Sequence, residues 1–172
     1  MKTLAILRHA KSSWDQPNTD DFGRPLNDRG WKAARRIGRE LRDRKVRFDL
    51  CLASPAARVR ETLDGVAESY GEFAFPVRFE RQMYLADPAT LLELVHGVPG
   101  DVENLLLVGH NPGLERVVAL LTADDRSGLR ERVEHKFPTA ALAVIDFAVP
   151  SWAEVKPASG KLVELILPRE LD

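Results

Sequence analysis

Residues 4–9 read Leu4-Ala5-Ile6-Leu7-Arg8-His9, a short apolar run that ends in a cation and an imidazole. Two later segments have the same form: residues 49–54 lead to Arg58, and residues 105–109 lead to His110. Each apolar run has the length of a buried parallel strand, and each is followed by a turn signal and a helical pattern. The sequence therefore predicts strand–helix repeats with charged or titratable residues at the strand ends.

Helix start signals mark the other boundaries of these repeats. Asn27 or Asp28 can cap a helix whose apolar residues recur every three or four positions. Ser54-Pro55 offers a hydroxyl cap followed by proline, which predicts a helix that starts directly after the second strand. Asp87-Pro88 and Asn111-Pro112 predict two more helix starts.

The fold class follows from the order of the elements. Strands are expected over residues 3–9, 49–54, 76–79, 104–109, 140–148 and 161–167, with a polar stretch over 122–138. The last two strands alternate apolar and polar residues and lie close together in the chain, as antiparallel neighbours do. We expect one α/β domain over residues 1–172. It is a three-layer α/β/α sandwich with a mostly parallel sheet and antiparallel C-terminal strands.

Composition excludes several classes of protein. The chain has 172 residues and a net charge of -1, which argues against a nucleic-acid binder. No apolar stretch has the length of a membrane span, and no secretory signal is visible, so we expect no membrane association. A single cysteine, Cys51, excludes an intramolecular disulfide and favours a cytoplasmic location.

The strand-end residues predict a phosphate site. In an open α/β sheet, ligands bind outside the carboxyl ends of the strands, so Arg8, His9, Arg58 and His110 should converge on one crevice. Guanidinium forks match phosphate oxygens at two points. Any one of these residues alone is more often a solvated charge or an ordinary histidine, but together they favour phosphoryl transfer.

His9 is the expected nucleophile of this site. Arg8 and Arg58 should lower its pKa and keep it neutral, with the second ring nitrogen donating to a backbone carbonyl. We expect His110 to donate to a further phosphate oxygen and, if protonated, to add positive charge.

The motifs resemble those of the histidine phosphatase superfamily, which has the phosphoglycerate-mutase-like fold. Arg8-His9-Ala10 resembles its Arg-His-Gly/Ala signature, residues 54–62 match Ser-x-x-x-Arg-x-x-x-Thr, and Gly109-His110 matches the third motif. The segments 8–12, 107–113 and 138–139 are similar to those of SixA-type phosphohistidine phosphatases.

This resemblance implies a metal-independent phosphatase that needs no cofactor. In it His9 is the phosphorylated residue, and Arg8, Arg58 and His110 complete the phosphate pocket. The substrate it implies is phosphohistidine on another protein, such as a signalling phosphotransfer domain.

A general acid is hard to find in the sequence. Histidine acid phosphatases place an aspartate after the second histidine, whereas this chain has Asn111. Glu80 is the nearest match to the glutamate of mutases, and it is equally well a solvated turn carboxylate. Imidazole leaves more easily than an alkoxide, so a missing acid favours phosphohistidine. The chain also lacks a long insertion that could form a lid, which predicts a shallow, open site.

Other functions stay open at this stage. A small-molecule phosphomonoesterase is the enzymatic alternative, and a phosphoprotein-binding or basic-surface module is the non-enzymatic one. Residues 24–47 carry ten basic and three acidic side chains, which we interpret as a solvated helix face. An acidic partner or weak nucleic-acid contact is the alternative reading of this segment.

Cysteine and metal chemistry are not expected. Six residues separate Cys51 from Arg58, where cysteine phosphatases have five, so we interpret Cys51 as a core residue. His9, His96, His110 and His135 do not fall at a recognised metal-ligand spacing.

Overall fold

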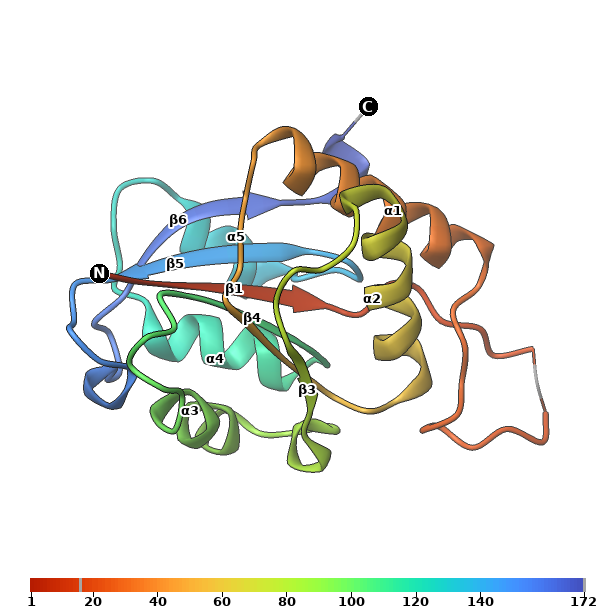
Figure 1. Ribbon diagram of the computed structural model, residues 1–172, viewed down its shortest axis with the longest axis horizontal. Coiled ribbons are helices and arrows are strands. Elements are labelled where there is room, and N and C mark those ends of the chain that lie inside the picture. The colour runs from red at the N-terminus through yellow and green to blue at the C-terminus, as the bar shows by residue number, and fades with distance from the viewer. Residues whose placement is uncertain (16, 172) are drawn as a thin grey trace.

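A six-stranded sheet forms the centre of the protein in the computed structural model, which describes residues 1–15 and 17–171 (Figure 1). The strands are β1 (Lys2–Arg8), β2 (Leu50–Ala53), β3 (Val77–Phe79), β4 (Asn104–Gly109), β5 (Leu142–Phe147) and β6 (Lys161–Ile166). Their order across the sheet is β3-β2-β4-β1-β5-β6. The first four strands are parallel, and β5 runs antiparallel to both β1 and β6. The predicted mostly parallel sheet with antiparallel C-terminal pairing is confirmed.

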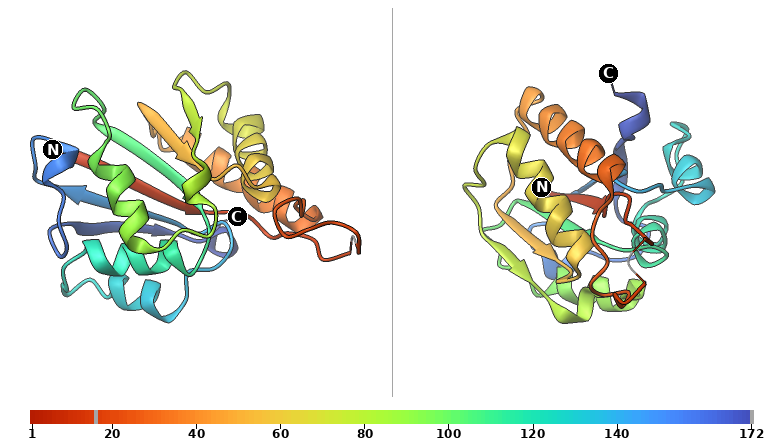
Figure 2. Two further views of the ribbon diagram at one scale, coloured as in Figure 1. Left: turned by 90° about the horizontal axis from the view of Figure 1, so that it is seen from below. Right: turned by 90° about the vertical axis from the view of Figure 1, so that its right-hand side faces the viewer.

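Helices cover both faces of the sheet and make the predicted three layers (Figure 2). They are α1 (Asp28–Asp43), α2 (Ala57–Tyr70), α3 (Pro88–His96), α4 (Gly113–Leu121) and α5 (Leu129–His135), with short 3-10 turns at Arg81–Met83, Trp152–Glu154 and Pro168–Glu170. Successive residues of a strand point to opposite faces. Leu4 and Ile6 of β1 therefore pack in one core with α3 and α4, and Ala5 and Leu7 in the other with α1 and α2.

Two of the predicted helix caps are present. The Asn27 side chain accepts a hydrogen bond from the Gly30 amide at 2.9 Å, and Asp87 accepts one from Thr90 at 2.8 Å. The Ser54 cap was wrong, because α2 begins at Ala57 and Ala56 precedes it without a side-chain cap. The Ser54 hydroxyl instead lies 2.7 Å from His110 Nε2 and accepts the amide of Ala56, the residue before the helix, at 3.3 Å, so the serine connects the site to the turn that precedes α2.

Helix α5 lies within residues 122–138, where no element was expected. Its one buried side chain is Val133. Leu129, four residues earlier, is partly buried against the same core. Two apolar residues in a seven-residue helix are too few to establish a 3.6-residue period, so the hydrophobic pattern did not reveal it. Among the helices of the described residues, none is both long and apolar enough to cross a bilayer.

The start of α1 is fixed against the chain that leaves β1. The backbone N–H of Asn27 donates to the Lys11 carbonyl at 3.0 Å. At Gly30 the helix comes so close that a Cβ atom would lie 2.1 Å from the Lys11 carbonyl oxygen. Only glycine fits at this contact, which places the N-terminal half of α1 beside the strand end.

Replacing Gly30 by alanine should therefore destabilise the protein. In an ordinary helix this change adds roughly 0.5–1 kcal/mol of stability, but here the clash should cost about 1–3 kcal/mol. Urea denaturation of Gly30→Ala measures the difference. Gly100→Ala is the control, because nothing lies within 4 Å of its added Cβ, and it should unfold at the wild-type midpoint or above. A Gly30→Ala protein as stable as Gly100→Ala contradicts the close approach.

Candidate active site

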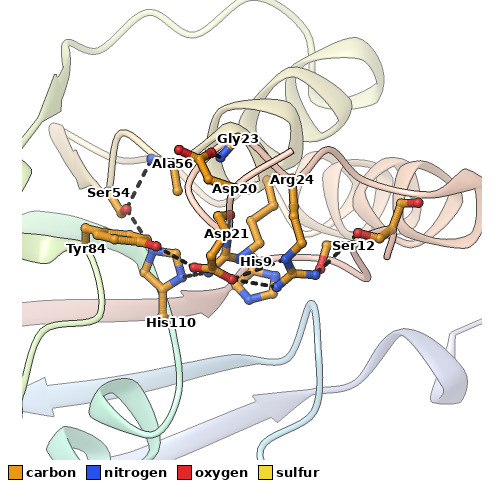
Figure 3. Close-up of polar contacts among 12 residues, drawn as sticks. His9, Ser12, Asp20, Asp21, Gly23, Arg24, Ser54, Ala56, Tyr84 and His110 are labelled. Atoms are coloured by element: carbon orange, nitrogen blue, oxygen red, sulfur yellow. Dashed lines mark hydrogen bonds and ion pairs between the residues drawn. The ribbon is translucent and has the colours of Figure 1, made fainter. Parts of the chain in front are cut away.

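The four predicted residues meet at the carboxyl edge of the parallel strands. Arg8 ends β1 and His9 follows it, Arg58 lies in the first turn of α2, and His110 follows β4. All four line one cavity of about 360 Å³. The rings of His9 and His110 are 5.4 Å apart between centroids, and Figure 3 shows both within the cluster of polar side chains.

His9 is held in one tautomer by the backbone carbonyl of the next residue. Its Nδ1 lies 2.7 Å from the Ala10 carbonyl oxygen, which can only accept, so Nδ1 carries the proton. Nε2 then has a free lone pair on a ring that lines the cavity. The pKa of His9 is lowered to about 4, first by burial and then by Arg58, Arg8 and Arg24, against the opposing hydrogen bond to Ala10. The arginine effect was predicted, but burial is the larger cause.

Thr62 connects this histidine to helix α2. Its hydroxyl accepts the Ala10 amide at 2.9 Å and donates to the Arg58 carbonyl at 2.6 Å, and the side chain is fully buried. The final threonine of the Ser-x-x-x-Arg-x-x-x-Thr motif thus joins the histidine turn to the arginine helix. The sequence contained this residue in a motif but gave no reason for its presence.

Both arginines have unsatisfied donors. Arg8 donates from Nη1 to the Phe137 carbonyl at 3.2 Å, while its Nε is buried with no partner. Arg58 is 2% exposed and its Nε also has no partner. Among the described residues, Arg130 also has a buried, unpaired Nε and lies outside the cavity, so this feature alone does not mark a ligand site. Buried N–H groups without acceptors are unfavourable, and an anion bound in the cavity can supply the missing acceptor to Arg8 and Arg58.

His110 lies between Arg58 and Ser54. Arg58 can only donate, so Nδ1 accepts from its Nη2 at 3.2 Å, and Nε2 donates to the Ser54 hydroxyl at 2.7 Å. Burial first, and Arg58 next, lower the pKa of His110 to about 3. The ring is therefore neutral and both nitrogens have protein partners. Donation from His110 to a phosphate oxygen stays a prediction, and it requires Nε2 to exchange the Ser54 hydroxyl for the ligand.

Comparison with known proteins identifies the family. The model of the histidine phosphatase superfamily (branch 1) matches residues 4–83, which carry His9 and Arg58. An uncharacterised protein of Mycobacterium tuberculosis is 36% identical over 166 residues, which cover 95% of this chain and all of the relative. The chain belongs to the histidine phosphatase superfamily.

Within this superfamily the chain is similar to SixA-type structures. A protein of Nakamurella multipartitia, provisionally named phosphohistidine phosphatase SixA, superposes with a TM-score of 0.84 at 28% identity, covering 97% of this chain and 96% of that one. Its counterpart from Agrobacterium tumefaciens, also provisionally named, has a TM-score of 0.80 at 31% identity, covering 97% and 98%. The similarity extends over the whole sheet and both helical layers.

This histidine phosphatase has an anionic residue that the sequence did not reveal. Asp21, from the loop between β1 and α1, contacts Arg58 Nη2 and Arg24 Nη2 at 3.1 Å each and accepts a hydrogen bond from the Tyr84 hydroxyl (Figure 3). The Tyr84 hydrogen bond, followed by Arg58 and Arg24, lowers the pKa of Asp21 to about 2 against a smaller opposing effect of burial. Asp21 is thus ionised and is no proton donor. Its carboxylate also accepts a hydrogen bond from Nη2 of Arg58.

The loop that carries Asp21 forms one wall of the cavity. Trp14, Asp21 and Arg24 all line it, and the Arg24 guanidinium lies 3.5 Å from the Trp14 ring centroid. The prediction of a shallow, open site did not include this wall. The sequence indicated only a polar loop here, because its three aspartates and two aromatic residues have no periodic pattern.

Glu80 lies outside the cavity. Its carboxylate pairs with Arg78 at 2.8 Å, as the solvated-turn interpretation had it. Asn111 lines the cavity and donates to the Phe137 carbonyl at 2.8 Å. None of the described carboxyl groups is therefore placed as an acid beside His9.

Cys51 is a core residue, as the spacing indicated. It is fully buried in β2, and burial raises the pKa of its thiol. Within the described residues, no three His, Cys, Asp or Glu side chains are grouped so that they could hold a metal ion.

The two site histidines should titrate far below a free imidazole. We expect His9 to protonate near pH 4 and His110 near pH 3, as measured by nitrogen NMR of the four imidazoles with His9→Gln for assignment. Because the folded pKa lies below the unfolded value of about 6.5, the unfolded chain binds more protons in this window. Stability should therefore decline as pH falls from about 6.5 towards 4, less steeply in His9→Gln. Protonation of His9 near 6.5 contradicts the account.

Thr62→Val should disturb the position of the His9 ring. The change leaves the buried Ala10 amide unpaired, which should lower the free energy of unfolding by about 1–3 kcal/mol and reduce turnover. Thr122→Val is a matched control, since this buried threonine also bonds a carbonyl four residues earlier, at 2.7 Å, away from the cavity. Both variants should lose stability, but only Thr62→Val should lower kcat. Equal kcat values for the two variants contradict a positioning role.

Proposed function

We propose that this histidine phosphatase removes phosphate from phosphohistidine carried by a protein, through a phosphorylated His9. The observation that carries the proposal is the unprotonated Nε2 of His9 in a cavity where two buried arginines have unpaired Nε donors. Phosphate oxygens fit those donors, and a phosphorus atom held there is within the range of a neutral imidazole nitrogen.

The reaction proceeds in two displacements. In the first, His9 Nε2 donates its lone pair to phosphorus, and the P–N bond of the substrate breaks. The substrate imidazole leaves with the bonding electrons and takes a proton from solvent. The positive charge that develops on His9 is stabilised at Nδ1–H by the Ala10 carbonyl. In the second displacement, water attacks phosphorus, the bond to Nε2 breaks and inorganic phosphate leaves.

The arginines stabilise the charge on the phosphoryl oxygens. Arg8 has only one hydrogen bond among the described residues and can turn its remaining donors to the ligand. Arg58 already donates to Asp21 through both Nη1 and Nη2. A phosphate dianion therefore competes with Asp21 for Arg58, and Asp21 must yield part of this contact when the substrate binds.

The absence of a neutral carboxyl group beside His9 supports the substrate class. Asp21 is ionised, Glu80 pairs with Arg78, and Asn111 is an amide. An alkoxide needs a proton as it leaves, whereas an imidazole does not need a protein acid. The site is thus better suited to P–N than to alkyl P–O bonds. The lone buried Cys51 favours the reducing cytoplasm as the compartment.

Substrate preference tests this assignment. We expect turnover of a phosphohistidine peptide to exceed that of a phosphoserine peptide and a sugar phosphate by orders of magnitude, with nitrophenyl phosphate between them, and EDTA to have no effect. Glu80→Gln should leave phosphohistidine turnover unchanged. Good activity on sugar phosphates that falls sharply in Glu80→Gln supports the small-molecule phosphomonoesterase instead. Binding of phosphopeptides without any turnover supports a non-enzymatic module.

Arginine variants test the mode of phosphate binding. Loss of Arg8 or Arg58 to alanine should lower the rate by roughly 10²–10³-fold, as for other donors that face transition-state charge. Arg58→Lys should recover only part of this rate, because lysine lacks the planar fork. Arg60→Lys on the same helix is the control, since Arg60 bonds the Pro55 carbonyl at 2.9 Å and does not line the cavity. Full activity of Arg58→Lys contradicts a two-point contact between the Arg58 guanidinium and the phosphate.

A further inference from the structure

A second cavity, of about 390 Å³, adjoins the active site and shares Lys11 and Thr139 with it. Its walls come from the chain after β1, the outer face of α1, residues 138–139 and the C-terminal turn. We name this cavity the cationic groove, after its five basic residues Lys11, Arg29, Lys32, Arg36 and Arg169.

We propose that the cationic groove binds an acidic face of the phosphohistidine-bearing protein, next to its phosphorylated residue. The proposal rests on the proposed function and names the surface by which the substrate protein is recognised.

The charge pattern of α1 is the first observation. Two arginines of this helix outside the groove have carboxylate partners, Arg35 with Glu68 at 2.6 Å and Arg42 with Asp43 at 3.2 Å. Within the described residues, none of the five basic side chains of the groove forms an ion pair, and no acidic residue lines it. Both ion pairs of the α1 arginines thus lie outside the groove, where Arg39 has none among the described residues.

The spacing of the unpaired charges is the second observation. Arg29, Lys32 and Arg36 are three and four residues apart, so they follow one another along the same face of α1. Like charges at this spacing destabilise a helix by a few tenths of a kcal/mol per pair. An anionic partner turns this repulsion into attraction, which gives these three residues of the basic segment 24–47 a role beyond a solvated face.

The floor of the groove favours a protein partner over a small anion or a nucleic acid. Ala33, Pro138 and Pro168 are half-buried and apolar, and they lie between the basic side chains. An inorganic anion leaves this floor in contact with water. A protein face that mixes carboxylates with apolar side chains covers it, and a net charge of -1 for the whole chain disfavours nucleic acid.

Peptide substrates test the groove separately from the chemistry. Two phosphohistidine peptides of the same length are compared, one with three glutamates flanking the histidine on one side and one with glutamines there. We expect kcat/KM of the wild-type protein to be at least tenfold higher for the glutamate peptide, mainly through KM, and the preference to shrink as salt is added.

Charge reversal locates the effect. The triple variant Arg29→Glu, Lys32→Glu, Arg36→Glu should lose the preference while kcat and nitrophenyl phosphate turnover stay within twofold of wild type. The matched control is Arg35→Glu, Arg39→Glu, Arg42→Glu, which changes the same charge on the same helix outside the groove. The control should keep the preference. Thermal unfolding of both variants shows that each is folded.

Four results overturn the proposal. If the wild-type protein has equal kcat/KM for the two peptides, the groove does not bind the substrate protein, and the proposed function is unaffected. An equal loss of preference in both triple variants has the same meaning. If duplex DNA inhibits the wild-type protein but not the groove variant, and the wild type does not prefer the glutamate peptide, the groove binds nucleic acid instead. Failure of the wild type to cleave either peptide, with nitrophenyl phosphate still hydrolysed, removes the proposed function and the groove proposal with it.

Discussion

The hydrogen bonds of Ala10 determine the geometry of the whole site. Its carbonyl accepts the Nδ1–H of His9, and its amide donates to Thr62, which in turn bonds the Arg58 carbonyl. On the other side of the strand exit, the Ala140 amide donates to the His9 carbonyl at 3.0 Å. His9, the proposed nucleophile, is thus positioned by contacts from the end of β1, α2 and the turn before β5. We expect a change in any of these three elements to displace its ring.

Electrostatics then separates the roles of the polar residues. Burial keeps both histidines neutral, while the arginines stay charged because guanidinium is a very weak acid. Asp21 offsets part of this charge at the mouth of the cavity, where its carboxylate is half-exposed. The result is a cationic cavity around the neutral His9, the proposed nucleophile, with one internal anion, Asp21.

Continuous apolar runs made the strands and the four principal residues predictable. The strands β1, β2 and β4 are buried on both faces, so their sequences contain little besides Leu, Ile, Val and Ala. Arg8, His9, Arg58 and His110 stand out directly after those strands or one turn later. The helix starts at Asn27 and Asp87 were predictable for a related reason, since each is a local side-chain-to-backbone contact.

The parts that sequence reasoning missed depend on contacts between distant segments. Asp21 meets Arg58 and Tyr84 across 37 and 63 residues, and Ser54 meets His110 across 56. Local propensity favoured Ser54 as a helix cap, and a tertiary hydrogen bond to His110 prevailed. The groove was hidden in the same way, because the sequence gave the basic segment but not which of its arginines find carboxylate partners.

Covalent chemistry at His9 is the central claim. It is tested most directly by mixing the protein with a phosphohistidine peptide labelled in the phosphoryl group and quenching in alkali within milliseconds. The account predicts label on the protein that resists base, is lost in acid and maps by mass spectrometry to His9, with formation and decay as fast as turnover. Label on another residue, or turnover without any labelled protein at the shortest times, contradicts it.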